Sequence, residues 1–118
     1  MELVAFVGKD KENWGQITAL INRFDCEKVF LVKDLNAENF PTNDKCELIE
    51  IDSTKALSSL TKDIQEGLKK SLSRDFEVAL SIASGSGKEH MALISALLNI
   101  PMGIKFIAYT KQGIEFLS

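Results

Sequence analysis

The chain has 118 residues, a formal net charge of −3 and a sequence pI of about 5.2. Its length suits a single domain, which we expect to cover residues 1–118, and its 45% hydrophobic and 26% charged residues are typical of globular proteins. The acidic balance speaks against binding to duplex nucleic acid, which needs a basic face, and no apolar run is long enough to span a membrane.

Strands and helices are predicted to alternate along the first half of the chain. The apolar run 2–7 lacks the alternation of a half-exposed strand and is predicted to be a buried parallel strand. Asp10 is the expected N-cap of a helix whose apolar residues recur mostly at steps of three and four: Trp14, Ile17, Leu20, Ile21 and Phe24. A second strand is expected over 28–32, a polar loop over 33–45 and a third strand over 47–51.

A long helix and a fourth strand are expected next. Asp52 and Ser53 are the predicted caps of this helix, and its apolar positions again recur at steps of three and four: Leu57, Leu60, Ile64, Leu68 and Leu72. Arg74 and Asp75 are expected to form the turn into a fourth strand over 77–83.

The last third of the chain is predicted to hold one helix and a hairpin. The helix follows the turn 84–88, ends near Asn99 and carries an apolar face: Met91, Ile94, Leu97 and Leu98. A fifth strand is expected over 104–109, and the turn 110–113 joins it to a short antiparallel strand over 114–117.

The order of these elements predicts an α/β fold of the Rossmann-like type. Strands that alternate with helices form a parallel sheet with helices on both faces, which makes a three-layer sandwich. We expect a mostly parallel six-stranded sheet in the order 3-2-1-4-5-6, ending in an antiparallel β-hairpin. Every strand-to-helix turn then lies on one edge, and a crevice is expected where the strand order reverses, between strands 1 and 4.

The first residues and the two cysteines indicate the compartment. No charged segment or cleavage site of a signal peptide precedes the apolar run that begins at Leu3. Cys26 and Cys46 are too few for a disulfide framework, so we expect reduced thiols. The prediction is a cytoplasmic protein with no membrane partner.

Two turns flank the predicted crevice, and both combine glycine with lysine. Backbone N–H groups left free at a helix N-terminus favour an anion, and lysines add positive charge. The alternative is that the glycines only permit tight packing and the lysines are solvated. We predict an anion site with these ligand-binding residues: Gly8, Lys9, Asp10, Lys11, Asn13, Ser84, Gly85, Ser86, Gly87 and Lys88.

More specific motifs do not fit the chain. The second turn is not a P-loop, because Ile82 and Glu89 stand where that motif needs a glycine and a hydroxyl. Gly8 alone does not make a dinucleotide fingerprint, and His90, the only histidine, lacks spaced partners for a metal, so no cofactor or metal is expected. Trp14 is expected to pack inside, or to stack on a base at the mouth of the crevice.

One block and the segments after it carry a family resemblance. Residues 78–88 read VALSIASGSGK, Met91 and Ala92 follow, and residues 103–109 read GIKFIAY. This arrangement resembles the CRISPR-associated Rossmann-fold (CARF) domains, which typically have an apolar strand, Gly-Gly-Thr-Lys, a methionine- or alanine-rich helix and a final hairpin. Here residues 85–88 read Gly-Ser-Gly-Lys, without the threonine, and Met91 falls one residue later than usual.

The resemblance implies a function. CARF domains form homodimers that bind cyclic oligoadenylate, the signal of type III CRISPR defence, across the two-fold axis. Most carry a second effector domain, whereas this chain ends at Ser118, so we expect a stand-alone domain. It would be a passive binder, a subunit of a larger regulator, or a metal-independent ring nuclease. In the ring nuclease, Lys88 would stabilise the developing charge, and Ser86 or the turn 9–13 would position the ring.

Two other readings stay open. One is a non-catalytic interaction or regulatory domain with a Rossmann-like sheet and no nucleotide ligand. The other is a small Rossmann-like domain that binds some other phosphate-bearing nucleotide.

Overall fold

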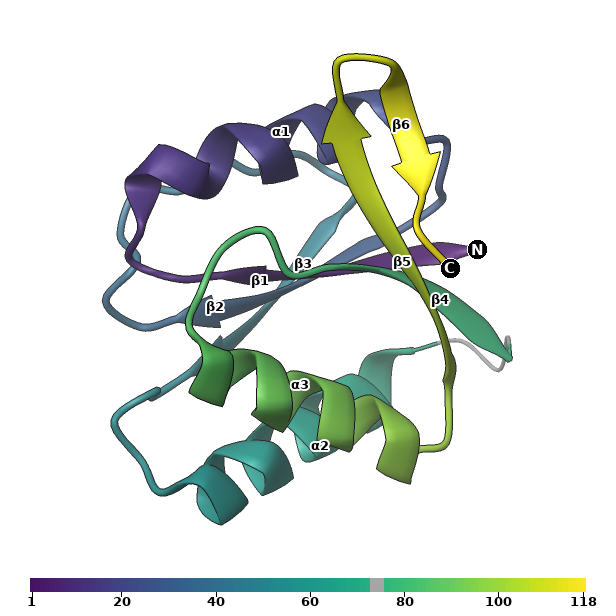
Figure 1. Cartoon of the computed structure of the whole chain (residues 1–118). Coiled ribbons are helices and arrows are strands. Elements are labelled where there is room, and N and C mark those ends of the chain that lie inside the picture. Colours follow the sequence, from purple (N-terminus) through teal and green to yellow (C-terminus); the bar gives the residue numbers. More distant parts are fainter. Residues whose placement is uncertain (73–75) are drawn as a thin grey trace.

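A computed structural model describes residues 1–72 and 76–118 and has the predicted α/β architecture (Figure 1). Six strands form one sheet in the order β3-β2-β1-β4-β5-β6. Neighbouring strands are parallel except for β5 and β6, which form the antiparallel hairpin. The predicted strand order and the edge position of the last strand are therefore confirmed.

The helices and strands occupy nearly the predicted ranges. The strands are β1 (Glu2–Val7), β2 (Val29–Asp34), β3 (Cys46–Ile51), β4 (Glu77–Ser81), β5 (Gly103–Thr110) and β6 (Gly113–Phe116). The helices are the 3-10 helix η1 (Lys11–Asn13), α1 (Trp14–Arg23), α2 (Leu57–Ser71) and α3 (Gly87–Asn99). Strand β2 runs further than predicted, because Lys33 and Asp34 still pair with β3. The predicted turn at Arg74 and Asp75 lies outside the described residues.

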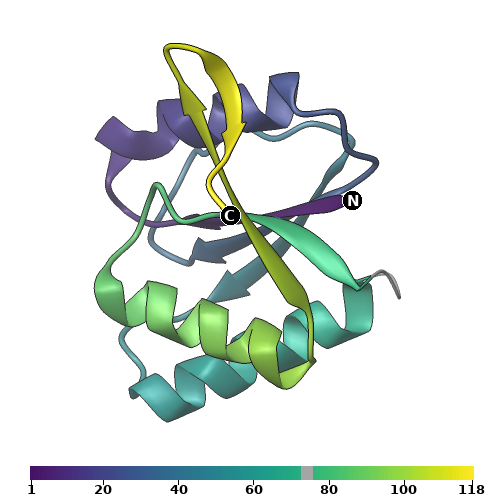
Figure 2. The ribbon, with the colours of Figure 1, turned by 45° about the vertical axis from the view of Figure 1, so that its right-hand side comes forward.

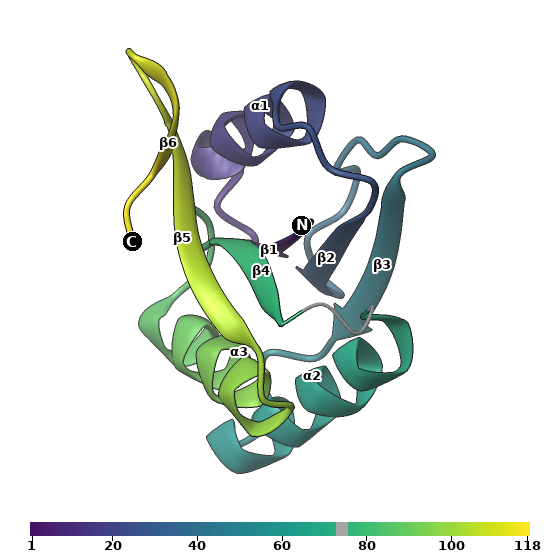
Figure 3. The same cartoon turned by 90° about the vertical axis from the view of Figure 1, so that its right-hand side faces the viewer.

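Helices cover both faces of the sheet (Figure 3). Helix α1 lies on one face, and α2 and α3 lie side by side on the other. In β1, Val4 and Phe6 belong to the core under α2 and α3. The alternate residues Leu3, Ala5 and Val7 belong to the core under α1. Burial on both faces explains why the strands read as continuous apolar runs.

Helix α3 buries a different face from the predicted one. Leu97 is buried as predicted, but Met91 and Leu98 are 56% and 59% exposed. Ala92 and Ala96 are fully buried instead. The reason is that α3 packs against α2 as well as the sheet, and small side chains let these elements approach closely. The spacing of the larger apolar residues alone did not predict this face.

The predicted helix caps are only partly confirmed, since Asp10 holds the N-cap position of η1 whereas Asp52 and Ser53 do not hold that of α2. Asp10 precedes η1, but its carboxylate makes no capping hydrogen bond there. Asp52 and Ser53 do not cap α2, whose N-cap residue is Ala56. The Asp52 carboxylate instead accepts hydrogen bonds from the N–H and the hydroxyl of Thr54, at 3.0 and 2.6 Å. These acidic side chains stabilise the turns at the sheet edge rather than the helices that follow.

The two cysteines are free thiols, as predicted. Cys26 lies in the core under α1, and Cys46 packs against the same core. Burial raises the pKa of the Cys26 thiol, which is therefore protonated at neutral pH. Within residues 1–72 and 76–118, no helix has the length and apolar character needed to cross a lipid bilayer.

Candidate anion-binding site

The two turns predicted to flank a crevice are tied directly to each other. The backbone N–H of Gly8 donates to the hydroxyl of Ser84 at 2.9 Å, and that hydroxyl donates to Oδ1 of Asp10 at 2.6 Å. The same Oδ1 accepts from the N–H of Gly85 at 3.0 Å. Oδ2 of Asp10 accepts from the side chain of Asn13 at 2.7 Å. We call these five residues the Asp10 cluster; it joins the turns after β1 and β4.

Two positions in the Asp10 cluster require glycine because the backbones approach closely. A Cβ on Gly8 would lie 2.8 Å from Oδ1 of Asp10 and 2.9 Å from Cα of Gly85. Gly85 has a φ of 101°, which other residues rarely adopt, and a Cβ there would lie 2.6 Å from the ring of Phe6. The turns are therefore in contact at the switch point, where the sequence predicted a crevice.

Asp10 remains ionised within this cluster. Burial acts to raise the pKa of Asp10, but hydrogen bonds from Ser84, Asn13 and Gly85 outweigh it and hold the pKa below the ordinary value of 3.8. The carboxylate is therefore charged at neutral pH and already binds the N–H of Gly85. This amide was expected to be free for a ligand, and the Asp10 carboxylate bonds it instead.

The amides left open at the start of α3 are those of Gly87 and Lys88. Ser86 and Glu89 form a capping box: the Ser86 hydroxyl accepts from the Glu89 N–H at 3.4 Å, and the Glu89 carboxylate accepts from the Ser86 N–H at 2.7 Å. The N–H groups of Gly87 and Lys88 have no acceptor among the described residues, and both residues are exposed. First-turn amides and the helix dipole favour an anion at this position.

The three lysines of the predicted site have different neighbours. The ammonium of Lys88 donates to the backbone carbonyl of Ser53 at 3.0 Å, so its charge lies over the loop between β3 and α2. The ammonium of Lys11 lies 5.7 Å from the ring centroid of Trp14. Lys9 has no partner within the described part of the chain. All three side chains are exposed and can turn toward an anion with little loss.

Asp34 also lies at the carboxyl edge of the sheet, although it was not among the site residues predicted from the sequence. It ends β2, is fully buried, and accepts from the Ser53 hydroxyl at 2.6 Å and from the N–H of Asn36 at 3.1 Å. The carbonyl of Ser53 in turn accepts from Lys88, so hydrogen bonds link the end of β2, the loop after β3 and the start of α3. The available signal was an acidic residue at the carboxyl end of a buried parallel strand, where Rossmann folds bind ribose.

Two rings support the backbone of the two turns. His90 Nε2 lies 2.7 Å from the carbonyl oxygen of Ser84, and its ring packs edge-on against Phe6. The indole N–H of Trp14 donates to the carbonyl of Gly8 at 2.8 Å, and the ring packs against the core under α1. Within the described part of the chain, no group of three His, Cys, Asp or Glu side chains is placed to hold a metal ion.

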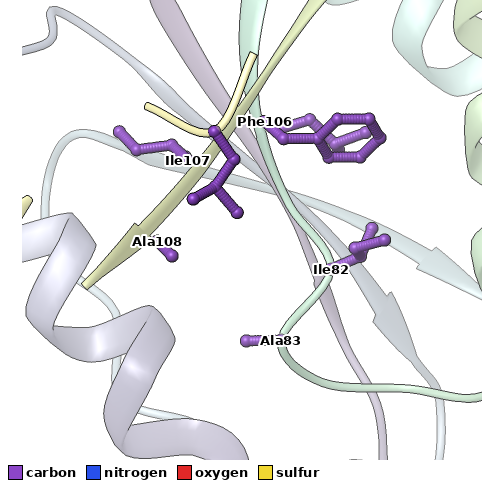
Figure 4. A pocket seen from close by; sticks show the side chains of 7 residues that line it. Ile82, Ala83, Phe106, Ile107 and Ala108 are labelled. Carbon is purple, nitrogen blue, oxygen red and sulfur yellow. The ribbon is translucent and has the colours of Figure 1, made fainter. Parts of the chain in front are cut away.

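The sheet opens between β4 and β5. Strand β4 ends at Ser81, earlier than predicted, and its last partner in β5 is Phe106, opposite Leu80. Strand β5 continues to Thr110 while the chain after Ser81 turns away. An apolar pocket of about 200 Å³ lies in the resulting gap (Figure 4), lined by Leu80, Ile82, Ala83, Phe106, Ile107, Ala108 and Leu117.

The sheet order and its polar edge define a Rossmann-like α/β protein. The fold is similar to a solved structure of Can2 from Sulfobacillus thermosulfidooxidans in complex with cyclic tetra-adenylate, with a TM-score of 0.62 and 13% sequence identity. The match covers 98% of this chain and 34% of the Can2 chain, so this chain spans about a third of the length of Can2. No protein-family model and no curated protein matches the chain. At this identity, the similarity concerns the fold.

Proposed function

We propose that this chain is a CARF-type protein that binds a cyclic oligoadenylate of type III CRISPR defence. The observation that carries the proposal is the start of α3, where the amides of Gly87 and Lys88 are open to an anion. Lys9 and Lys11, on the turn that the Asp10 cluster ties to this helix start, supply further positive charge for the phosphates. The fold shared with Can2, which was solved with cyclic tetra-adenylate, supports this ligand class.

A homodimer is part of this proposal. A ring with a two-fold axis presents the same groups to two copies of one site. The exposed face of α3 supports a contact between two copies, because Met91 and Leu98 are exposed there and Ile94 between them is half-buried. Apolar side chains gathered on one exposed helix face are typical of interaction surfaces.

Cyclic tetra-adenylate and cyclic hexa-adenylate test the proposed function. A ring present at a hundredfold excess over its Kd stabilises the folded protein by about 2.7 kcal/mol, which raises the melting temperature by on the order of 10 °C. Calorimetric titration should give one ring for two chains, and a linear adenylate of equal length is the matched control. If neither ring raises the melting temperature, the proposed ligand is wrong; one ring for each chain would contradict the dimer.

We also propose that the site cleaves its ring without a metal. A ribose 2′-hydroxyl held in line with the neighbouring phosphate attacks it: the bond from O2′ to phosphorus forms, the bond to O5′ breaks, and a proton passes from O2′ to the leaving oxygen. Lys88 would leave the Ser53 carbonyl to stabilise the charge on the phosphate. The Ser86 hydroxyl, an acceptor in the capping box, still has its hydrogen to donate.

Replacing Lys88 by alanine should slow this cleavage by about 100-fold, because one donor to the developing charge is lost. The measurement is the rate at which labelled cyclic tetra-adenylate becomes a linear adenylate with a 2′,3′-cyclic phosphate. Lys55→Ala is the matched control, since Lys55 lies on the neighbouring loop and binds Asp63 at 2.7 Å. An unchanged rate in Lys88→Ala removes Lys88 from the mechanism, and binding without cleavage by the wild type indicates a passive sensor.

A Rossmann-like interaction domain without a nucleotide ligand is the second candidate. Two observations favour it. The Asp10 cluster joins the two turns at the switch point, and the ammonium of Lys88 donates to the Ser53 carbonyl instead of facing these turns. This candidate predicts that no adenylate ring changes the melting temperature. It also predicts that the exposed face of α3 binds another protein chain.

A further inference from the structure

The β5–β6 hairpin crosses α1 (Figure 2), and β5 contacts this helix. A polar pocket lies between the hairpin and α1. Its volume is about 430 Å³, and it is lined by Gln16 of α1 and by Tyr109, Thr110 and Lys111 of the hairpin. The pocket is shallow and open to solvent. The proposed phosphate contacts do not involve these four residues.

The pocket lies on the same edge of the sheet as the start of α3. Tyr109 stands near the carboxyl end of β5, and β5 is the neighbour of β4, whose turn leads into α3. On the other side, the pocket lies near the turn after β1. The indole of Trp14 donates to the Gly8 carbonyl of that turn, and Trp14 precedes Gln16 by two residues in the chain. The start of α3 and the pocket are therefore exposed at the same edge, on its two sides.

The side chain of Gln16 has the chemistry that recognises adenine. It is exposed and has no partner among the described residues, so its amide offers one acceptor and two donor hydrogens. Adenine presents the N6 amino donor beside the N7 acceptor, and a glutamine amide pairs with both at once. Guanine presents two acceptors at these positions, so the same amide satisfies only one of them.

The other lining residues suit the rest of a nucleotide. Tyr109 is half-buried against the core under α1, and the Arg23 guanidinium lies over its ring, 5.1 Å from the centroid. Lys111 is exposed and supplies a positive charge for a phosphate. Thr110 has a structural role, because its hydroxyl donates to the Glu115 carboxylate and accepts from the Gln112 N–H within the β5–β6 hairpin.

We infer that this pocket is an adenine subsite and that Gln16 determines the preference for adenine over guanine. The inference rests on the proposed function and names the residue that reads the base of its ligand. Tyr109 forms part of the wall of the subsite, and Lys111 binds the adjoining phosphate.

Titration of cyclic tetra-adenylate and cyclic tetra-guanylate, which have the same ring size and charge, tests the inference. The wild type should bind the adenylate ring more tightly than the guanylate ring. In Gln16→Ala the affinity for the adenylate ring should fall by about tenfold or more, and the two affinities should become nearly equal. In Gln16→Arg the ratio of the two affinities should shift toward guanylate, because a guanidinium donates to both acceptors of guanine. The matched control is Gln65→Ala, on α2 and the opposite face of the sheet, which should leave both affinities unchanged.

The outcomes separate this inference from the proposed function. A Gln16→Ala variant with wild-type affinity and wild-type preference overturns the adenine subsite and leaves the proposed function standing. A wild type that binds neither ring overturns the proposed function itself. If Gln16→Ala lowers the melting temperature of the free protein, the test rests on Gln16→Arg. An adenylate-to-guanylate affinity ratio in Gln16→Arg equal to that of the wild type then overturns the subsite.

Discussion

Replacing Gly85 by alanine is expected to lower the free energy of unfolding by about 2–6 kcal/mol, from backbone strain and overpacking together. Its φ of 101° is strained for any residue with a side chain, which costs of order 1–3 kcal/mol. The new Cβ would also lie 2.6 Å from the Phe6 ring and 3.2 Å from Nε2 of His90, and such overpacking costs about 1–3 kcal/mol. Urea denaturation followed by circular dichroism measures the change.

Gly87→Ala is the matched control for this prediction. Gly87 is the first residue of α3, two positions further along the same turn, and a Cβ there would meet nothing within 4 Å. Alanine is the better helix former by about 1 kcal/mol, so the control should be as stable as the wild type or slightly more stable. If Gly85→Ala is as stable as Gly87→Ala, the close packing of the two turns is wrong.

Replacing Asp10 by alanine should lower the free energy of unfolding by about 2–4 kcal/mol at pH 7, because groups that need its carboxylate lose their acceptor. The hydroxyl of Ser84, which is fully buried, and the N–H of Gly85 both donate to Oδ1. The same urea titration measures this loss. Asp52→Ala is the control and should change stability much less, since that carboxylate is solvent-exposed and accepts only within its own turn.

The contribution of Asp10 should also depend on pH in a defined direction. The hydrogen bonds hold its pKa below the ordinary value of 3.8 in the folded protein. A group with a lowered folded pKa stabilises the fold above its unfolded pKa, and this stabilisation is lost as the pH falls through the folded pKa. The stability difference between the wild type and Asp10→Asn should therefore be constant above about pH 5 and shrink below about pH 4. A difference that does not change between pH 7 and pH 3 would contradict an ionised Asp10 in the cluster.

The sequence determined the order and the type of the elements, because hydrophobic periodicity is a local property of the chain. The double-sided burial of β1 was visible in its unbroken apolar run, and the alternation of strands with helices led to the parallel sheet. The ends of the strands and the buried faces of the helices were harder to predict from the sequence. Strand β4 stops at Ser81 because the chain turns away from β5 there, and α3 turns Ala92 and Ala96 inward because it packs on α2. Both features depend on neighbours distant in sequence.

For the site, the sequence determined which turns meet, because the carboxyl ends of parallel strands share one edge. Tertiary structure alone decided which groups bond one another there. Asp10 binds the Ser84 hydroxyl across 74 residues of chain, and Lys88 binds the carbonyl of Ser53 across 35. No local pattern encodes such contacts, since they depend on how close packing aligns two turns. The same packing joined the turns at the switch point, left the amides of Gly87 and Lys88 open, and formed the pocket at Gln16.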